Sequence, residues 1–226
     1  MSAPAEPGLA GRAGDMRSSP RICLTSHDTV IAGDPQSDAA LAAQFARRHV
    51  LELPDLIQPD VLQTLAPAIG AARFVACAVD GVGPRLRERP TRLGNLLRHL
   101  LRRQALRDWL TRITGVSPLG AVTGAVARFE GGGGQALDWH DDIGASARML
   151  AVTINLGDAP YEGGVFEMRR RDTGEILFRH THRQPGSALV FRVSPALEHR
   201  VTPVNAGGPR TVFSGWYLSA SGEDSA

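Results

Sequence analysis

The chain has 226 residues, of which 42% are hydrophobic and 21% are charged, and it carries a formal net charge of +2. This composition is typical of one well-buried globular domain, and the small net charge gives no reason to expect a nucleic-acid or anionic-membrane partner. All 25 basic residues are arginine, so a buried cationic anchor for an acidic ligand has to be an arginine.

Residues 1–35 are rich in Pro, Gly, Ala and Ser and show little periodicity, which predicts a largely disordered leader. After this leader, the spacing of apolar residues predicts three helices, over 37–49, 60–72 and 93–114. Pro67 lies inside the second helix, where it removes a backbone donor, and Gly115 is placed to end the third. Between these helices, the sequence also predicts a short strand over 50–53 and a basic loop over 84–90.

The pattern changes after Val116, where short apolar runs alternate with glycine-rich turns. Seven strands are predicted, over 121–129, 148–156, 164–168, 176–179, 188–192, 199–204 and 211–218. Many short strands at this spacing are typical of an antiparallel sandwich or barrel, and Asp172-Thr173-Gly174 is typical of a hairpin turn. We therefore predict an α+β protein with a single domain over 36–226, in which 36–118 is mainly helical and 119–220 forms the β-rich core.

The two cysteines, Cys23 and Cys77, are far apart and form no Cys-x-x-Cys pair, so they are typical of thiols in a cytoplasmic protein. A single disulfide between them stays open as an alternative. Residues 2–20 lack the apolar stretch of a signal peptide, and no apolar run approaches the ~20 residues of a membrane helix. We expect a cytoplasmic protein without a membrane partner.

The residues that indicate chemistry are His140 and Asp142, which are two positions apart. On an extended strand, such residues point to the same face, so both side chains could reach one metal ion. Two histidines and one carboxylate on one face suit iron(II) and leave coordination positions open. His199, on a later predicted strand, is the best candidate for the third ligand.

A second histidine pair, His180 and His182, also shares a predicted strand face. No carboxylate accompanies this pair at a matching spacing, and Arg179 and Arg183 flank it. We therefore interpret His180 and His182 as part of an exposed hairpin arm rather than as a rival metal site.

Arg210 lies eleven residues after His199, across a turn rich in Asn and Gly. A hairpin of this length would bring Arg210 back near His199, where its guanidinium could bind a carboxylate through two parallel N–H bonds. The alternative is a solvent-exposed arginine at the end of a strand.

Several motifs in the last hundred residues, taken together, resemble the iron(II)/2-oxoglutarate oxygenase superfamily, specifically its prolyl 4-hydroxylase-like branch. The similar region covers roughly 122–219, and each motif alone is weak, but their order is that of the family. The motifs are His140-x-Asp142, Val152-Thr153-Ile154-Asn155-Leu156, Tyr161-Glu162-Gly163-Gly164-Val165-Phe166, Pro185-Gly186-Ser187-Ala188-Leu189-Val190-Phe191, His199-Arg200-Val201-Thr202-Pro203-Val204, Arg210 and Trp216.

The resemblance implies a double-stranded β-helix, or jelly-roll, supported by helices from the N-terminal half. It implies that His140, Asp142 and His199 bind Fe(2+), and that Arg210 binds the far carboxylate of 2-oxoglutarate. Relatives often have a tyrosine that holds 2-oxoglutarate where this chain has Phe129, so that role stays unassigned. Halogenating relatives lack the metal carboxylate, which Asp142 supplies here.

Four further residues are candidates for the pocket. Thr153 and Asn155 alternate on one predicted strand and could touch the cosubstrate. Trp139 and Trp216 are possible pocket residues, although packing in the core is the favoured role for each.

The reaction that the resemblance implies uses Fe(2+), 2-oxoglutarate and O2, and it releases succinate and CO2. We expect hydroxylation of an unactivated C–H bond in an amino-acid-like, peptidyl or other small-molecule substrate. Desaturation or cyclisation in small-molecule tailoring is one alternative, and a non-catalytic jelly-roll binding protein is another. The arginines of the basic loop, among them Arg85, could attract an acidic substrate, but a solvated surface is the favoured interpretation.

Overall fold

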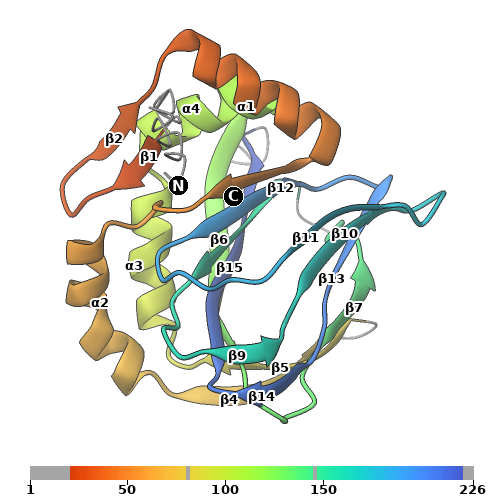
Figure 1. Ribbon diagram of the computed structural model, residues 1–226. Helices are drawn as coiled ribbons and strands as arrows, with labels where there is room; N and C mark the ends of the chain where they lie inside the picture. Colours follow the sequence, from red (N-terminus) through yellow and green to blue (C-terminus); the bar gives the residue numbers. More distant parts are fainter. Residues whose placement is uncertain (1–20, 80–81, 145–146, 221–226) are drawn as a thin grey trace, which may run out of the picture.

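The computed structural model describes residues 21–79, 82–144 and 147–220, and Figure 1 shows its helices gathered on one side of a β-rich body. The helices in this part of the chain are α1 (Pro35–Arg48), α2 (Pro59–Ala71), α3 (Arg92–Leu101) and α4 (Gln104–Thr114). None of these helices has the length and apolar character needed to span a bilayer.

The larger sheet has seven strands, each antiparallel to its neighbours. In spatial order they are β3 (Val50–Leu53), β12 (Ala188–Arg192), β8 (Arg148–Asn155), β15 (Arg210–Ser219), β6 (Leu119–Phe129), β5 (Gly83–Glu88) and β4 (Phe74–Val79). The long strands β6, β8 and β15 form its centre, and they supply residues to both of its faces.

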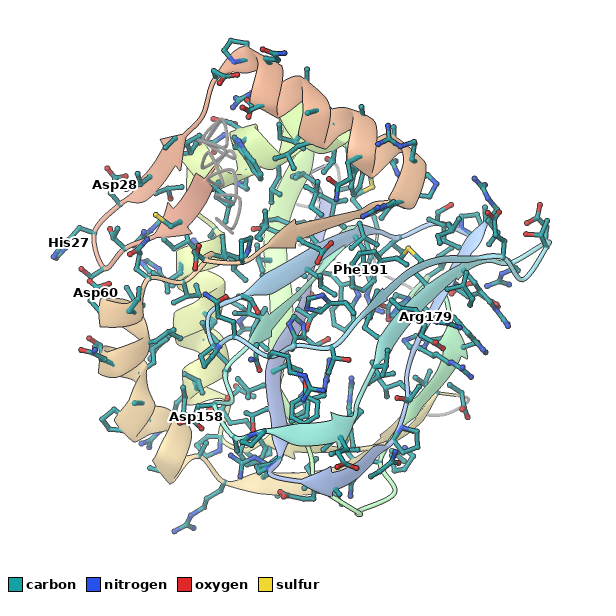
Figure 2. The ribbon with its side chains drawn as sticks, viewed as in Figure 1. His27, Asp28, Asp60, Asp158, Arg179 and Phe191 are labelled. Carbon is teal, nitrogen blue, oxygen red and sulfur yellow. The ribbon has the colours of Figure 1, made fainter. Side chains whose placement is uncertain are left out.

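The smaller sheet has four antiparallel strands, in the order β11 (Ile176–His180), β10 (Phe166–Arg170), β13 (Leu197–Val201) and β7 (Leu137–His140). A separate pair is formed by β14 (Val204–Gly207) and β9 (Tyr161–Gly163). Side chains from the two larger sheets pack together in one apolar cluster that includes Phe129, Phe166, Met168 and Phe191, the last of which is labelled in Figure 2. This arrangement is the predicted jelly-roll, and the predicted α+β class is confirmed.

The alternation of residues along β8 explains how the helices and the pocket share the larger sheet. Leu150, Val152 and Ile154 are buried in the cluster that packs against α3 and α4, whereas Ala151 and Thr153 face the interior of the jelly-roll. Successive side chains of a strand point to opposite faces, so one face binds the helices and the other is left for a site. The helices therefore support the sheet from outside and leave its inner face open.

The predicted single helix over 93–114 is wrong, because the chain contains two helices that are separated at Arg102 and Arg103. Arg103 has an extended backbone, with φ −57° and ψ 131°. Its guanidinium donates hydrogen bonds to the carbonyl oxygens of Thr25, Ser26 and Asp28. This tertiary contact stabilises the break between the two helices. The helical spacing of the leucines cannot predict it, because the partners of Arg103 lie far away in the sequence. Gly115 ends the second helix in a left-handed conformation, as expected.

The predicted leader over 1–35 is wrong at its C-terminal end, while residues 1–20 lie outside the described residues. Arg21–Leu24 (β1) and Thr29–Ala32 (β2) form an antiparallel hairpin, and α1 already begins at Pro35. Ile22 and Leu24 are buried in the helix-side core, which provides the apolar contacts that a two-stranded hairpin lacks in isolation. The boundaries of the predicted domain stay a prediction.

The predicted basic loop over 84–90 is also wrong, because most of it forms strand β5. This strand pairs with β4 on one side and with β6 on the other. Arginines alternate with other residues along β5 and hide its strand character, since a charged residue at an inward position breaks the expected apolar pattern.

Candidate metal centre

His140 and His199 are brought together by strand pairing. His140 is the last residue of β7, and it lies directly opposite His199 of β13 in the antiparallel ladder. The centroids of the two imidazole rings are 4.1 Å apart. Directly opposite side chains on one face of a sheet are near neighbours, so the register alone places the two imidazoles side by side.

Asp142 joins the two histidines by a route that differs from the predicted one. The strand ends at His140, and Asp142 follows it in the left-handed region with φ 60°. A turn, rather than the two-residue repeat of a strand, therefore points the carboxylate back toward the imidazoles. Residues other than glycine rarely adopt this conformation, and such strained backbone is typical of functional sites.

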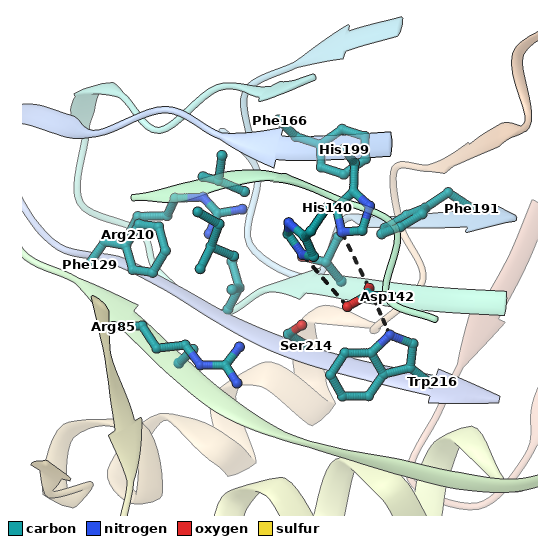
Figure 3. A pocket seen from close by; sticks show the side chains of 15 residues that line it. Arg85, Phe129, His140, Asp142, Phe166, Phe191, His199, Arg210, Ser214 and Trp216 are labelled. Atoms are coloured by element: carbon teal, nitrogen blue, oxygen red, sulfur yellow. Dashed lines mark hydrogen bonds and ion pairs between the residues drawn. The ribbon is translucent and has the colours of Figure 1, made fainter. Parts of the chain in front are cut away.

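The three side chains converge on one point (Figure 3). One ligand atom from each residue can be chosen so that all three lie within 4.8 Å of one another. The Asp142 carboxylate oxygens lie 3.6 Å from His140 Nε2 and 3.3 Å from His199 Nε2. Two imidazoles and one carboxylate at this spacing match the facial donor set that suits iron(II).

The protonation states of these groups also suit a metal. His140 Nδ1 lies 2.6 Å from the carbonyl oxygen of Asp138, which can only accept, so Nδ1 carries the hydrogen and Nε2 keeps its lone pair. Burial, followed by the charge of His199, lowers the pKa of His140. Burial acts to raise the pKa of Asp142, but hydrogen bonding and charge from His199 outweigh it and lower that pKa to about 2. Near neutral pH, the site therefore offers a neutral imidazole and an ionised carboxylate.

Two further side chains hold Asp142 in place. Trp216 Nε1 donates a hydrogen bond of 2.8 Å to Asp142 Oδ2, and Arg148 donates one of 3.0 Å to the Asp142 carbonyl oxygen. The Arg148 guanidinium also lies over the Trp216 ring, 3.9 Å from its centroid. Trp216 thus packs against the inner apolar cluster, as favoured, and it also lines the cavity and orients a candidate ligand.

Replacing Trp216 with phenylalanine should weaken metal binding about tenfold without unfolding the protein, because only the hydrogen bond that orients Asp142 is lost. The measurement is an anaerobic titration with iron(II), compared with Trp139→Phe as the matched control. Trp139 lies outside the cavity, under the guanidinium groups of Arg169 and Arg200. Equal affinity in the two variants would contradict this role for Trp216.

The triad opens into a cavity with about 540 Å³ of empty space, part of which is continuous with solvent. Phe129, Phe166 and Phe191 form much of its wall. Thr153, a low-ranking candidate from the sequence, does line this cavity. Asn155 does not, because its side chain bonds the backbone of Gly157 and shapes a turn.

Arg210 enters the same cavity from the start of β15, directly opposite Phe129 of β6. The residue is only 3% exposed, and its Nε has no hydrogen-bond partner among the described residues. Burial lowers the pKa of its guanidinium, and the neighbouring Tyr161 hydroxyl opposes this shift. A buried cation with an unsatisfied donor is costly unless a ligand compensates it, so Arg210 is equipped to bind an anion.

The interpretation of His180 and His182 as an exposed arm is wrong. His182 is 1% exposed, and its Nε2 lies 3.2 Å from Thr153 Oγ1. His180 Nδ1 lies 3.3 Å from Glu52 Oε2 on β3, the edge strand of the larger sheet. The flanking residues Arg179 and Arg183 are exposed, but the histidines between them lie on the opposite, more buried side of the segment. His182 instead packs behind the cavity wall.

His182 should make stability depend on pH. Burial is the main cause that lowers its pKa well below 6.5, with Arg210 and His180 adding to the effect. The unfolded chain takes up a proton near this pH while folded His182 does not, so the free energy of unfolding should fall on acidification below pH 6.5. One such group contributes at most ~1.4 kcal/mol per pH unit. Urea unfolding measured at several pH values should show that the free energy of unfolding of His182→Asn depends less steeply on pH than that of the wild type. The exposed control His27→Asn should keep the pH dependence of the wild type.

Comparisons with known proteins agree with the fold and with the donor set of the site. Residues 124–218 match the family described as the 2OG-Fe(II) oxygenase superfamily. The matched region lies in the C-terminal jelly-roll and covers less than half of the chain. Together with the His-Asp-His triad, the match supports an enzyme of the dioxygenase type that uses Fe(2+), 2-oxoglutarate and O2. A sequence search against curated proteins finds no match.

Solved structures share the fold at low sequence identity. A prolyl-4-hydroxylase from Pseudomonas putida is 17% identical, with a TM-score of 0.59, over 80% of this chain and 98% of that one. A Trichoplax adhaerens prolyl hydroxylase in complex with a hypoxia inducible factor peptide fragment is 15% identical, with a TM-score of 0.60, over 82% and 90%. The epimerase SnoN from nogalamycin biosynthesis, in complex with Fe3+, alpha ketoglutarate and nogalamycin RO, is 18% identical, with a TM-score of 0.59, over 83% and 85%.

Proposed function

We propose that His140, Asp142 and His199 bind the iron(II) ion and that Arg210 binds the far carboxylate of 2-oxoglutarate. The observation that supports this proposal most strongly is the convergence of the three ligand atoms in one cavity with Arg210, whose Nε has no hydrogen-bond partner among the described residues. The donor set suits iron(II), and the planar guanidinium suits a carboxylate.

Each of these residues has a defined task in this proposal. The Asp138 carbonyl keeps the His140 Nε2 lone pair directed toward the metal, and Trp216 holds the Asp142 carboxylate. Arg210 positions the cosubstrate from one end. Bound iron, 2-oxoglutarate and O2 together supply the oxidation: one oxygen atom ends in succinate, the other in the product, and CO2 is released. The aromatic walls exclude water from this reaction.

We propose further that the reaction is hydroxylation of an unactivated C–H bond in an amino-acid-like, peptidyl or small-molecule substrate. The cavity wall is made mainly of aromatic and aliphatic side chains, which supports a substrate group with an unactivated C–H bond beside the metal. Desaturation or cyclisation is the alternative, and the likeness to an epimerase adds epimerisation. Product mass separates these reactions: hydroxylation adds one oxygen, desaturation or cyclisation removes two hydrogens, and epimerisation leaves the mass unchanged.

The test is an anaerobic titration of the metal-free protein with iron(II) and 2-oxoglutarate, followed by exposure to O2. We expect a weak visible charge-transfer band on titration and succinate after O2 is admitted. Asp142→Ala should lose both signals, whereas Asp172→Ala, a change in an exposed hairpin turn, should keep them. Absence of the band and of succinate in the wild type would refute the assignment of the site.

A cytoplasmic location is proposed as well, on the basis of the cysteines. Cys23 is buried and Cys77 is partly exposed, and neither forms a disulfide. Free thiols are typical of proteins that stay in a reducing compartment. Cell fractionation would test this proposal.

A further inference from the structure

Arg85 is a second arginine in the cavity, a position that the sequence analysis considered but did not favour. Arg85 lies on β5. The next residue, Leu86, pairs with Arg128 of β6, so the antiparallel register places Arg85 beside Phe129 on the inner face of the sheet. Figure 3 shows its side chain entering the cavity below Arg210 and pointing toward Ser214. The favoured interpretation of this arginine as solvated surface is therefore wrong.

The Arg85 guanidinium has no ionic partner in the described part of the chain. Its Nε is buried without a hydrogen-bond acceptor, and Asp142 is the one acidic side chain among the described cavity residues. Cys77, its register partner on β4, contacts it, but a neutral thiol is only a weak acceptor. Burial lowers the pKa of Arg85, while Cys77 and the more distant Asp142 act to raise it.

The charges of the filled site, which assume the proposed function, also leave Arg85 uncompensated. Asp142 balances one of the two charges of iron(II), so the metal contributes one net positive charge. Arg210 and Arg85 contribute one each, whereas 2-oxoglutarate carries two negative charges. One positive charge therefore remains in a largely apolar cavity, where an unpaired ion is costly.

The two arginines also differ in their access to solvent. Arg210 is 3% exposed and lies in the wall of the jelly-roll, whereas Arg85 is half-buried on a strand near the edge of the sheet. The deeply buried Arg210 is therefore suited to binding the cosubstrate. The more accessible Arg85 is suited to binding a ligand that enters after the cosubstrate.

We infer that Arg85 binds a carboxylate of the substrate, so that this oxygenase acts on an acidic small molecule or on an acidic group of a larger one. The inference rests on the proposed function and adds the substrate class to it. A guanidinium can bind a carboxylate through two parallel hydrogen bonds, which would fix both the position and the orientation of the substrate beside the metal.

The experiment measures binding of matched acid and amide probes to protein that is loaded anaerobically with iron(II) and 2-oxoglutarate. The pairs are 3-phenylpropionate with 3-phenylpropionamide, and N-acetyl-L-alanine with its amide. Calorimetry and the shift of the visible band both report binding without turnover. We expect the wild type to bind each acid about tenfold more tightly than its amide.

Arg85→Gln should abolish this preference, and Arg85→Lys should retain part of it, because lysine keeps the charge but lacks the planar fork. The control Arg92→Gln removes the same charge from an exposed position and should behave like wild type. The inference is wrong if the wild type binds acid and amide equally, or if Arg85→Gln retains the preference. It is also wrong if Arg85→Gln weakens 2-oxoglutarate binding as much as Arg210→Gln does.

These results separate the inference from the proposed function. A wild type that forms no iron–2-oxoglutarate band refutes both. A wild type that forms the band but shows no preference for acids refutes only the role of Arg85.

Discussion

Replacing His199 with alanine should abolish the iron(II)–2-oxoglutarate band and reduce succinate formation at least about hundredfold. The reason is geometric: the Nε2 atom of His199 lies 3.3 Å from Asp142, opposite His140 in the sheet, so its removal leaves two donors on one side of the site. The measurement is an anaerobic titration, with metal content determined in parallel.

The matched control is His27→Ala, which removes an exposed imidazole far from the cavity. His199 is itself buried, so a general loss of structure has to be excluded by circular dichroism of the metal-free variant. A folded His199→Ala protein that still binds iron(II) and 2-oxoglutarate as wild type does would remove His199 from the site. The histidine–carboxylate centre would then need another ligand.

Replacing Arg210 with glutamine should raise the Kd for 2-oxoglutarate about hundredfold, while kcat at saturation changes much less. The guanidinium acts by holding the cosubstrate in both the ground state and the transition state, and such uniform binding affects KM more than kcat. The Kd comes from the anaerobic band, and KM comes from succinate formation without an added substrate.

The stability of Arg210→Gln in urea tests whether a weaker binding of 2-oxoglutarate results from a loss of structure. The guanidinium is buried with an unsatisfied Nε, so its removal should leave the metal-free protein at least as stable as wild type in urea. Arg179→Gln, at an arginine whose side chain is 64% exposed, is the control. An unchanged Kd in a stable Arg210→Gln protein would assign the cosubstrate carboxylate to another residue, with Arg85 the first to be tested.

Much of the architecture could be predicted from the sequence, because it depends on local patterns. Short apolar runs in β8 and β15 identify strands, and the helical spacing of leucines identifies the helices that cover the larger sheet. The order of the motifs around His140, Asp142, His199 and Arg210 predicted the fold, and the structure brings these four side chains to one cavity. Their individual roles in binding iron and 2-oxoglutarate stay a proposal.

Features that depend on contacts between distant segments could not be predicted in this way. The break at Arg103 is held by carbonyl oxygens of the β1–β2 hairpin, more than seventy residues earlier in the chain. A window of neighbouring residues contains no information about such a partner. The same limit explains why the sequence predicts a disordered leader where the β1–β2 hairpin forms.

The residues proposed to bind iron and 2-oxoglutarate can be read from the chain alone, because iron(II) and a carboxylate demand particular donor types in a particular order. How these residues meet depends on the folded structure: Asp142 turns back in a left-handed conformation that Trp216 and Arg148 support. The inward direction of Arg85 also depends on it. Charge alone cannot say whether an arginine points to water or into a cavity, because the direction of a side chain follows from the pairing and register of its strand.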